Sequence, residues 1–159
     1  EGEDGSSSTF GATYLHPAYQ IANILFRYNK EAIWSNQENI FDSSIHNANY
    51  LNLKLVHLDG PSTWNLGFTY ALANKVAKAS DSNAFNHTAG RVFTPTQDQS
   101  SDLGMEVDLD YSYKLNSEVH LDLNLGYLMP GDYFAYTNET DSNTVENSFL
   151  IKFGGSVQF

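Results

Sequence analysis

The sequence predicts an all-β fold, an antiparallel transmembrane β-barrel, and three observations lead to that prediction. Apolar and polar side chains alternate over several stretches of about ten residues, which places them on opposite faces of a strand. In the stretch at 105–114 one of these faces is wholly apolar and the other strongly polar, as expected for strands between lipid and a watery lumen. Short and long connections also follow each other along the chain, as periplasmic turns and extracellular loops do in outer-membrane barrels.

The clearest alternation lies in residues 103–159, where three strands are predicted. The first two are joined by a three-residue turn at 115–117, and a polar loop at 130–147 leads to the third. The apolar face of the three strands consists of Met105, Val107, Leu109, Tyr111, Tyr113, Val119, Leu121, Leu123, Leu125, Tyr127, Phe149, Ile151, Phe153, Val157 and Phe159. Acidic, basic and amide side chains occupy the alternate positions.

A hairpin is predicted before this region, with strands at 49–58 and 63–73. Between them stands Asp-Gly-Pro-Ser at 59–62, which consists of residue types that tight turns select. Matching the apolar faces across this turn pairs His57 with Trp64, near the strand ends where an aromatic girdle is expected.

The N-terminal part of the chain has a weaker pattern. A first strand is predicted over 9–15, and a second over 20–30, where Ile24 and Phe26 alternate with Asn23, Leu25 and Arg27. Residues 30–47 are interpreted as a loop folded over or into the barrel, and a helical turn within them is the alternative. Long external loops are predicted at 30–47, 74–102 and 130–147.

Residues 1–159 are therefore interpreted as a single barrel segment with six or seven strands. An open sheet would leave unpaired backbone groups in hydrocarbon, at several kcal/mol each. We expect the barrel to be completed by upstream sequence, by a second chain or by copies of this chain. A complete eight-stranded barrel with unrecognised strands is the alternative. Because the chain starts without Met, we expect either a removed signal peptide or missing upstream sequence.

Composition excludes several classes of function. The net charge of -11 argues against nucleic-acid binding, and the absence of cysteine excludes disulfides, thiolate metal sites and attached haem. The sequence contains no Gly-x-Ser-x-Gly, no His-Glu-x-x-His and no phosphate-binding glycine loop. We therefore predict neither an enzyme nor a bound metal or cofactor, although acidic side chains in the long loops, such as Asp98 and Asp132, are of a type that binds calcium.

The C-terminal part of the chain resembles the end of alginate-export proteins and related porin-like outer-membrane barrels. The resemblance is carried by Leu-Gly-Met-Glu-Val-Asp-Leu at 103–109, Tyr-Ser-Tyr-Lys-Leu-Asn at 111–116 and Leu-Gly-Tyr-Leu-Met-Pro-Gly-Asp-Tyr-Phe at 125–134. It implies that the segment ends a longer barrel, and that the terminal aromatic Phe159 is presented to the barrel assembly machinery. Family members export anionic polysaccharide through a lumen rich in Arg and Lys, whereas acidic residues predominate at the inward positions here.

Alternation assigns two sets of side chains. The predicted lumen-lining charged residues are Arg27, Lys54, Glu106, Asp108, Asp110, Lys114, Glu118, Asp122 and Lys152. The predicted lipid-facing or girdle residues are Trp64, Tyr70, Tyr113, Tyr127, Phe149 and Phe159. With the turn at 115–117, Asp110 is expected opposite Asp122, where two carboxylates repel each other unless a cation or proton lies between them. The acids form either a stripe that favours cations or a charge ladder, neutralised by Arg27, Lys54 and Lys152, that plugs the lumen.

The predicted function is porin-like: passive passage or export of a hydrophilic solute through the outer membrane of a Gram-negative cell. The expected partners are outer-membrane lipid, lipopolysaccharide and the barrel assembly machinery. The alternative is a structural barrel with a charge-plugged lumen, which anchors or sheathes a partner and displays loops. An enzyme that uses Ser112 and His120 is a third hypothesis, because these residue types imitate a catalytic triad.

Overall fold

A five-stranded antiparallel sheet dominates the computed structural model of the chain, which describes residues 20–26, 45, 47–80, 84–86, 91–136 and 144–158. Its strands are β1 (Ala48–Asp59), β2 (Ser62–Ala73), β5 (Asp102–Lys114), β6 (Val119–Pro130) and β7 (Ser148–Val157), and they lie side by side in that order. The predicted all-β antiparallel architecture is confirmed. The sheet is open, because β1 and β7 form its two edges and are not paired with each other.

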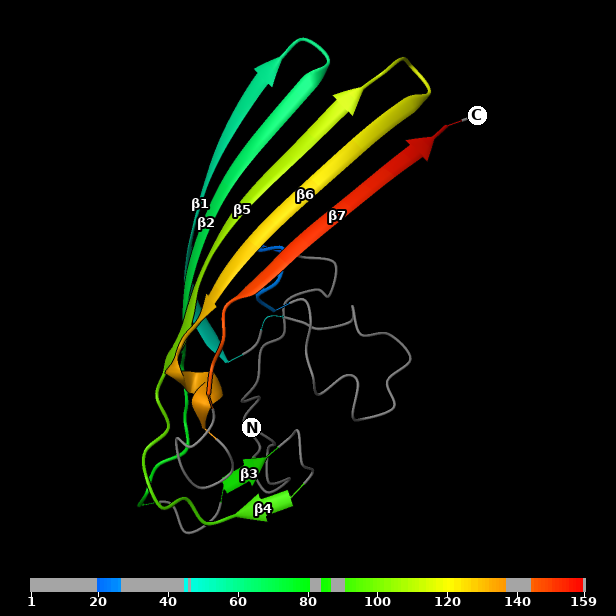
Figure 1. Ribbon diagram of the computed structural model, residues 1–159. Coiled ribbons are helices and arrows are strands. Elements are labelled where there is room, and N and C mark those ends of the chain that lie inside the picture. The colour runs from blue at the N-terminus through cyan, green and yellow to red at the C-terminus, as the bar shows by residue number, and fades with distance from the viewer. Residues whose placement is uncertain are drawn as a thin grey trace, which may run out of the picture.

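The connections alternate in length as predicted. The two short turns, β1–β2 and β5–β6, lie at one end of the sheet, and the long connections lie at the other (Figure 1). The long β2–β5 connection contains the two-stranded hairpin of β3 (Ala84–Asn86) and β4 (Arg91–Phe93), which was not predicted. The β6–β7 connection contains the 3₁₀-helix η1 (Asp132–Ala135). No helix among the described residues has the length and apolar character needed to cross a bilayer.

The β1–β2 hairpin forms with the predicted register. His57 pairs with Trp64, and Asp59 pairs with Ser62 across the two-residue loop Gly60-Pro61. Gly60 has a φ of 54°, a left-handed conformation that glycine adopts at no steric cost. The hydrophobic pattern and the turn residues therefore specify the same register.

The predicted β5–β6 register is wrong, because the turn lies one residue later than predicted and each β5 residue therefore pairs two residues further along β6. Lys114 pairs with His120 and Asp110 pairs with Asn124, so Asp110 and Asp122 are not opposite each other. The reason is the side chain of Asn116, whose Oδ1 accepts hydrogen bonds from the N–H groups of Glu118 (2.9 Å) and Val119 (2.8 Å). These bonds close a turn at 116–118, and the Leu115 N–H bonds to the Val119 carbonyl (3.0 Å).

We expect Asn116→Ala to lower the free energy of unfolding by about 1 kcal/mol, because it removes the acceptor of two turn hydrogen bonds. Asn116→Asp keeps that acceptor and should remain close to the wild type. Denaturant titration followed by tryptophan fluorescence measures the difference. Equal losses in both variants would show that the turn does not depend on this oxygen.

A β-bulge interrupts the long-connection end of β5. Ala71 pairs with Gly104 and Leu72 with Asp102, so Leu103 is the extra residue. Gly104 has a φ of 97°, a conformation available to few residues besides glycine. The bulge turns Leu103 toward the polar face of the sheet, where it packs in a small core with Ala22, Leu25, Ala71, Ala73 and Leu128.

The strand predicted over 20–30 is wrong where the structure describes it, because residues 20–26 form bends and a turn. They lie against the sheet instead of pairing with it. Residues 27–30, the strand predicted over 9–15 and all but residues 45 and 47 of the loop predicted at 30–47 lie outside the described residues, as do Arg27 and Phe159.

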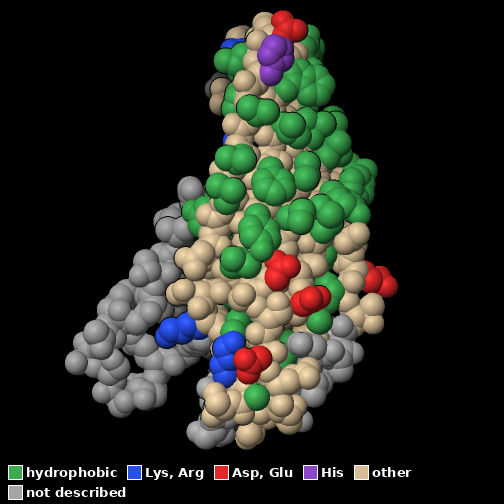
Figure 2. All heavy atoms as spheres, turned by 90° about the vertical axis from the view of Figure 1, so that its left-hand side faces the viewer, with side chains coloured by type: hydrophobic (Ala, Val, Ile, Leu, Met, Phe, Trp, Pro, Cys, Tyr) green, Lys and Arg blue, Asp and Glu red, His purple; other side chains and the backbone are tan. Residues whose placement is uncertain are grey.

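One face of the sheet, called here the apolar face, exposes large hydrophobic side chains. Its middle row runs across the five strands through Leu55, Leu66, Leu109, Leu125 and Ile151. Ile151 is 62% exposed, and Phe153 on the same edge strand is 73% exposed. Figure 2 shows hydrophobic side chains gathered over the sheet, with charged side chains mainly toward the long connections. Soluble monomers rarely expose a continuous apolar surface of this kind.

Candidate functional site

The opposite face, called here the polar face, carries acidic, basic and amide side chains in rows across the strands. Three consecutive rows of this face contain the carboxylates of Glu106, Asp108 and Asp110 in β5. Thr69, Glu106 and Leu128 share the first row, Gly67, Asp108 and Gly126 the second, and Asn65, Asp110 and Asn124 the third. The register therefore places these three acids on one face of the sheet, opposite the apolar face.

Glu106 and Asp108 bind the main chain of residues 20–26. The two carboxylate oxygens of Glu106 accept hydrogen bonds from the N–H groups of Ile24 (2.7 Å) and Leu25 (2.6 Å). Oδ2 of Asp108 accepts one from the Asn23 N–H (3.3 Å). Three consecutive backbone N–H groups thus point at carboxyl oxygens. Glu106 is 0% exposed and Asp108 is 5% exposed.

Amide and hydroxyl groups on both sides of these carboxylates form further hydrogen bonds that involve residues 21 and 23. Asn23 Nδ2 donates to Asp110 Oδ1 (2.9 Å) and to the Leu125 carbonyl (3.2 Å). The Ile21 carbonyl accepts hydrogen bonds from Asn52 Nδ2 (2.9 Å) and from the hydroxyl group of Thr69 (3.2 Å). Together these contacts tie residues 21–25 to β1, β2, β5 and β6.

Gly126 makes room for this segment. A Cβ atom at Gly126 would stand 3.1 Å from Asp108 Oδ1, 3.2 Å from Cβ of Asn23 and 3.2 Å from Cγ1 of Ile24. On the other side of Asp108, Gly67 also lacks a side chain. The two glycines therefore let residues 23–24 and the Asp108 carboxylate lie close to the sheet.

The shifted register replaces the predicted pair of repelling carboxylates with hydrogen-bonded pairs. Asn124 Nδ2 donates to Asp110 Oδ1 (2.8 Å), and the hydroxyl group of Ser112 donates a short hydrogen bond to Asp122 Oδ1. No cation is needed between these groups. Ser112 makes no hydrogen bond to His120 among the described residues, so the arrangement that a Ser-His nucleophile requires is not formed there.

The remaining charged side chains of the predicted lumen set are Lys54, Lys114, Glu118 and Lys152, and all four are exposed. Within the described part of the chain, the lysines make no ion pair with the acids of β5, so the predicted charge ladder is not formed by them. Lys54 and Lys152 are each two strands away from the β5 acids in their own rows. Backbone and amide groups donate hydrogen bonds to these acids instead.

Five of the predicted girdle residues lie on the apolar face, namely Trp64, Tyr70, Tyr113, Tyr127 and Phe149. Toward the short turns, the rings of Trp64 and Tyr111 are 4.3 Å apart between centroids, and Tyr111 stacks on Tyr113 at 6.5 Å. The hydroxyl group of Tyr111 lies 3.2 Å from Ser62 Oγ, so its polar end has a partner. Rings with an apolar body and a polar tip suit a membrane interface.

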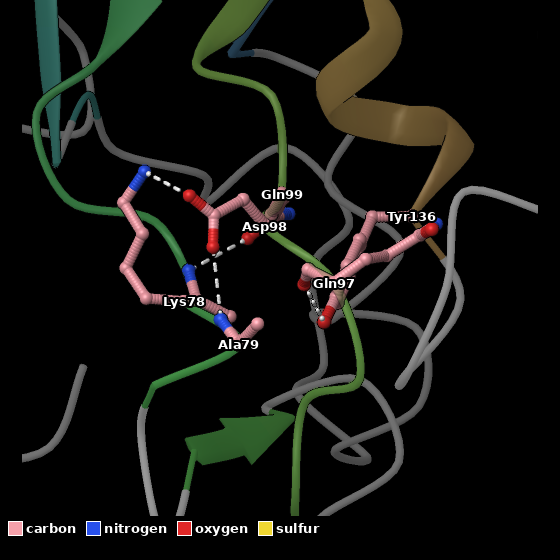
Figure 3. A network of polar contacts seen from close by, with 7 residues as sticks. Lys78, Ala79, Gln97, Asp98, Gln99 and Tyr136 are labelled. Carbon is pink, nitrogen blue, oxygen red and sulfur yellow. Dashed lines mark hydrogen bonds and ion pairs between the residues drawn. The ribbon is translucent and has the colours of Figure 1, made fainter.

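The long connections have their own polar network (Figure 3). Asp98 accepts hydrogen bonds from the Ala79 N–H (2.9 Å) and from Lys78 Nζ (3.2 Å). The pKa of the Asp98 carboxyl lies below its ordinary value. The main cause is the hydrogen bond from the Ala79 N–H, and the hydrogen bond from Lys78 lowers the pKa further. Nearby, the hydroxyl group of Tyr136 donates to the Gln97 carbonyl (3.1 Å). The part of the chain that the structure describes contains no group of three His, Asp or Glu side chains that would hold a metal ion.

Sequence reasoning missed the central feature of the site, the binding of residues 20–26 by Glu106 and Asp108. The sequence of residues 20–26 alternates in the same way as that of a short strand, so it gave no sign of this binding. The available signal was the pair of glycines, Gly67 and Gly126, on the polar face of otherwise regular strands, since glycine in a strand marks a close approach by other backbone.

No family model, curated protein or solved structure matches this chain. The resemblance to alginate-export proteins therefore stays a prediction.

Proposed function

We propose that this chain is part of an outer-membrane β-barrel that gives passive passage to a hydrophilic solute. The observation that carries the proposal is the division of the sheet into an apolar face and a polar face over five adjoining strands. In such a barrel the apolar face contacts lipid and lipopolysaccharide, and the polar face lines the lumen. The strands contain 10 to 13 residues, and a tilted strand needs about 9 to 11 to cross a bilayer.

Closure of the barrel requires further strands. Because each neighbouring pair in the sheet is antiparallel, β1 and β7 run in the same direction. An all-antiparallel barrel must therefore add an odd number of strands between these edges. Copies of the five-stranded sheet alone would meet in parallel junctions, so upstream sequence or a second chain that supplies an odd number fits better.

The solute path in this proposal follows the part of the polar face that residues 20–26 leave open. That part carries Asp122, His120 and the exposed Lys114 and Lys152, which are hydrophilic groups of both signs. Residues 20–26 narrow the lumen toward the long connections. The long connections are then extracellular, and the short turns and the end of β7 are periplasmic.

Single-channel recording in a planar lipid bilayer tests the proposal. We expect stepwise conductance from the purified protein, and we expect Lys152→Glu to shift the reversal potential in a salt gradient toward cation preference, because Lys152 lies on the polar face. The matched control is Phe153→Leu, which changes the next residue on the apolar face and should leave the reversal potential unchanged. Inserted protein that never conducts would contradict the proposal.

A structural barrel is the second candidate, and the burial of Glu106 beneath residues 20–26 favours it. If the lumen is filled along its whole length in this way, the barrel anchors or sheathes a partner and displays its loops. This candidate predicts a protein that inserts and folds in bilayers, shows no conductance, and shows none after Lys152→Glu.

A further inference from the structure

Residues 20–26 are held by two neighbouring carboxyl groups that have different surroundings. Glu106 is fully satisfied as an anion, since each of its oxygens accepts a backbone N–H. Asp108 accepts one N–H on Oδ2, but its Oδ1 is buried and has no hydrogen-bond partner among the described residues. The two carboxyl groups are neighbours, because they bind the consecutive N–H groups of Asn23 and Ile24, yet as carboxylates both are only acceptors. A proton on Asp108 supplies the missing donor.

The charged groups around this pair do not provide another donor. On β5 the next group is Asp110, which is also acidic, and the inward positions of β2 and residues 20–26 carry no titratable side chain. Gly126 is the β6 partner of Asp108. The titratable groups farther away on the polar face are Lys54 on β1, Lys114 on β5, His120 and Asp122 on β6, and Lys152 on β7.

We propose that residues 20–26 form a proton-coupled plug, which is closed when Glu106 is ionised and Asp108 carries a proton. On closure Asp108 takes a proton from water, and on opening the carboxyl group is hydrated and returns the proton. Lowering the pH therefore favours the closed plug, and raising the pH favours release. Because a plug requires a lumen, this inference rests on the proposed function, although the experiment below measures the segment directly and needs no conductance.

Two neutralising substitutions at neighbouring positions are expected to have opposite effects. Glu106→Gln replaces one acceptor oxygen by an NH₂ group that faces a backbone N–H, so the closed position loses a hydrogen bond and gains two opposed donors. Asp108→Asn keeps an acceptor for the Asn23 N–H and supplies a permanent donor toward Glu106, as the proton does. Simple loss of negative charge would change both variants in the same direction.

Thiol labelling of Ala22→Cys measures the position of the segment, because the chain has no other cysteine and Ala22 is only 7% exposed. At neutral pH in detergent micelles, Glu106→Gln should raise the labelling rate by a polar thiol reagent about tenfold or more, and Asp108→Asn should lower it. Asp122→Asn is the matched control, because Asp122 lies on the same face and bonds to Ser112. It should stay within about twofold of the parent.

The pH dependence provides a second measurement that does not depend on the folding of Glu106→Gln. The labelling rate of Ala22→Cys, divided by that of the exposed Ser156→Cys, should fall as the pH of the buffer is lowered. In Asp108→Asn this dependence should be absent. Rates that rise in both Glu106→Gln and Asp108→Asn, or a ratio that does not change with pH, would overturn the proposal. A protein that labels as expected but does not conduct would contradict the proposed function instead.

Discussion

Gly104→Ala is expected to destabilise the folded protein by about 3 to 5 kcal/mol, the largest effect of any single methyl group considered for this chain. Two costs combine. Gly104 has a φ of 97°, and a Cβ atom there would stand 2.2 Å from the Met129 carbonyl oxygen and 2.5 Å from the Gly131 nitrogen. Both neighbours are backbone atoms, so the β5–β6 pairing itself has to shift.

Gly154→Ala is the matched control, because a Cβ atom at Gly154 in β7 meets nothing within 4 Å. It should change the unfolding free energy by no more than about 0.5 kcal/mol. Urea titrations of both variants in the same detergent give the comparison. Similar stability of the two variants would mean that the bulge at Gly104 is not needed for the fold.

Ile151→Arg is expected to cost about 2 to 4 kcal/mol in a lipid bilayer, because it places a cation in the middle row of the apolar face. Ile151 is already 62% exposed within this chain, so few protein contacts are lost. If this face met water, a substitution at such a position would change stability by no more than about 0.5 kcal/mol. The cost therefore depends on what covers the face.

Ser156→Arg is the control, because it places the same cation on the polar face of the same strand. It should leave the free energy of unfolding nearly unchanged, since Ser156 is exposed there. The free energy of unfolding of both variants is measured in lipid vesicles. A difference of less than about 0.5 kcal/mol between them would contradict lipid contact at Ile151 and the membrane assignment that depends on it.

The sequence by itself located the five strands of the sheet and the direction in which most of their side chains point, although it also predicted a strand over 20–30 that residues 20–26 do not form. Alternation requires only that successive side chains of a strand project to opposite faces, so the strands within 49–58, 63–73, 105–114, 119–127 and 149–157 could be assigned without tertiary information. The pairing of His57 with Trp64 followed from matching the apolar faces of the two strands across the turn at 59–62.

The tertiary structure alone decided the position of the β5–β6 turn and the site of the bulge in β5. At both places, several local backbone arrangements are compatible with the same sequence pattern. Asn116 moves the β5–β6 turn by one residue, and this change separates Asp110 from Asp122 without altering the face of either. The bulge places the Leu103 side chain on the polar face, although simple alternation would place it on the apolar face. The positive φ of Gly104 allows the backbone to form this bulge.

Residues 20–26 are the clearest case of a tertiary decision. Their alternation is compatible with a strand, but the acceptors that bind their N–H groups, Glu106 and Asp108, lie more than 80 residues away in the sequence. Local pattern contains no information about such partners. In the folded sheet, Gly126 leaves space beside these buried carboxylates. Residues 20–26 can therefore lie on the polar face and bind Glu106 and Asp108, which is more favourable than forming a further strand.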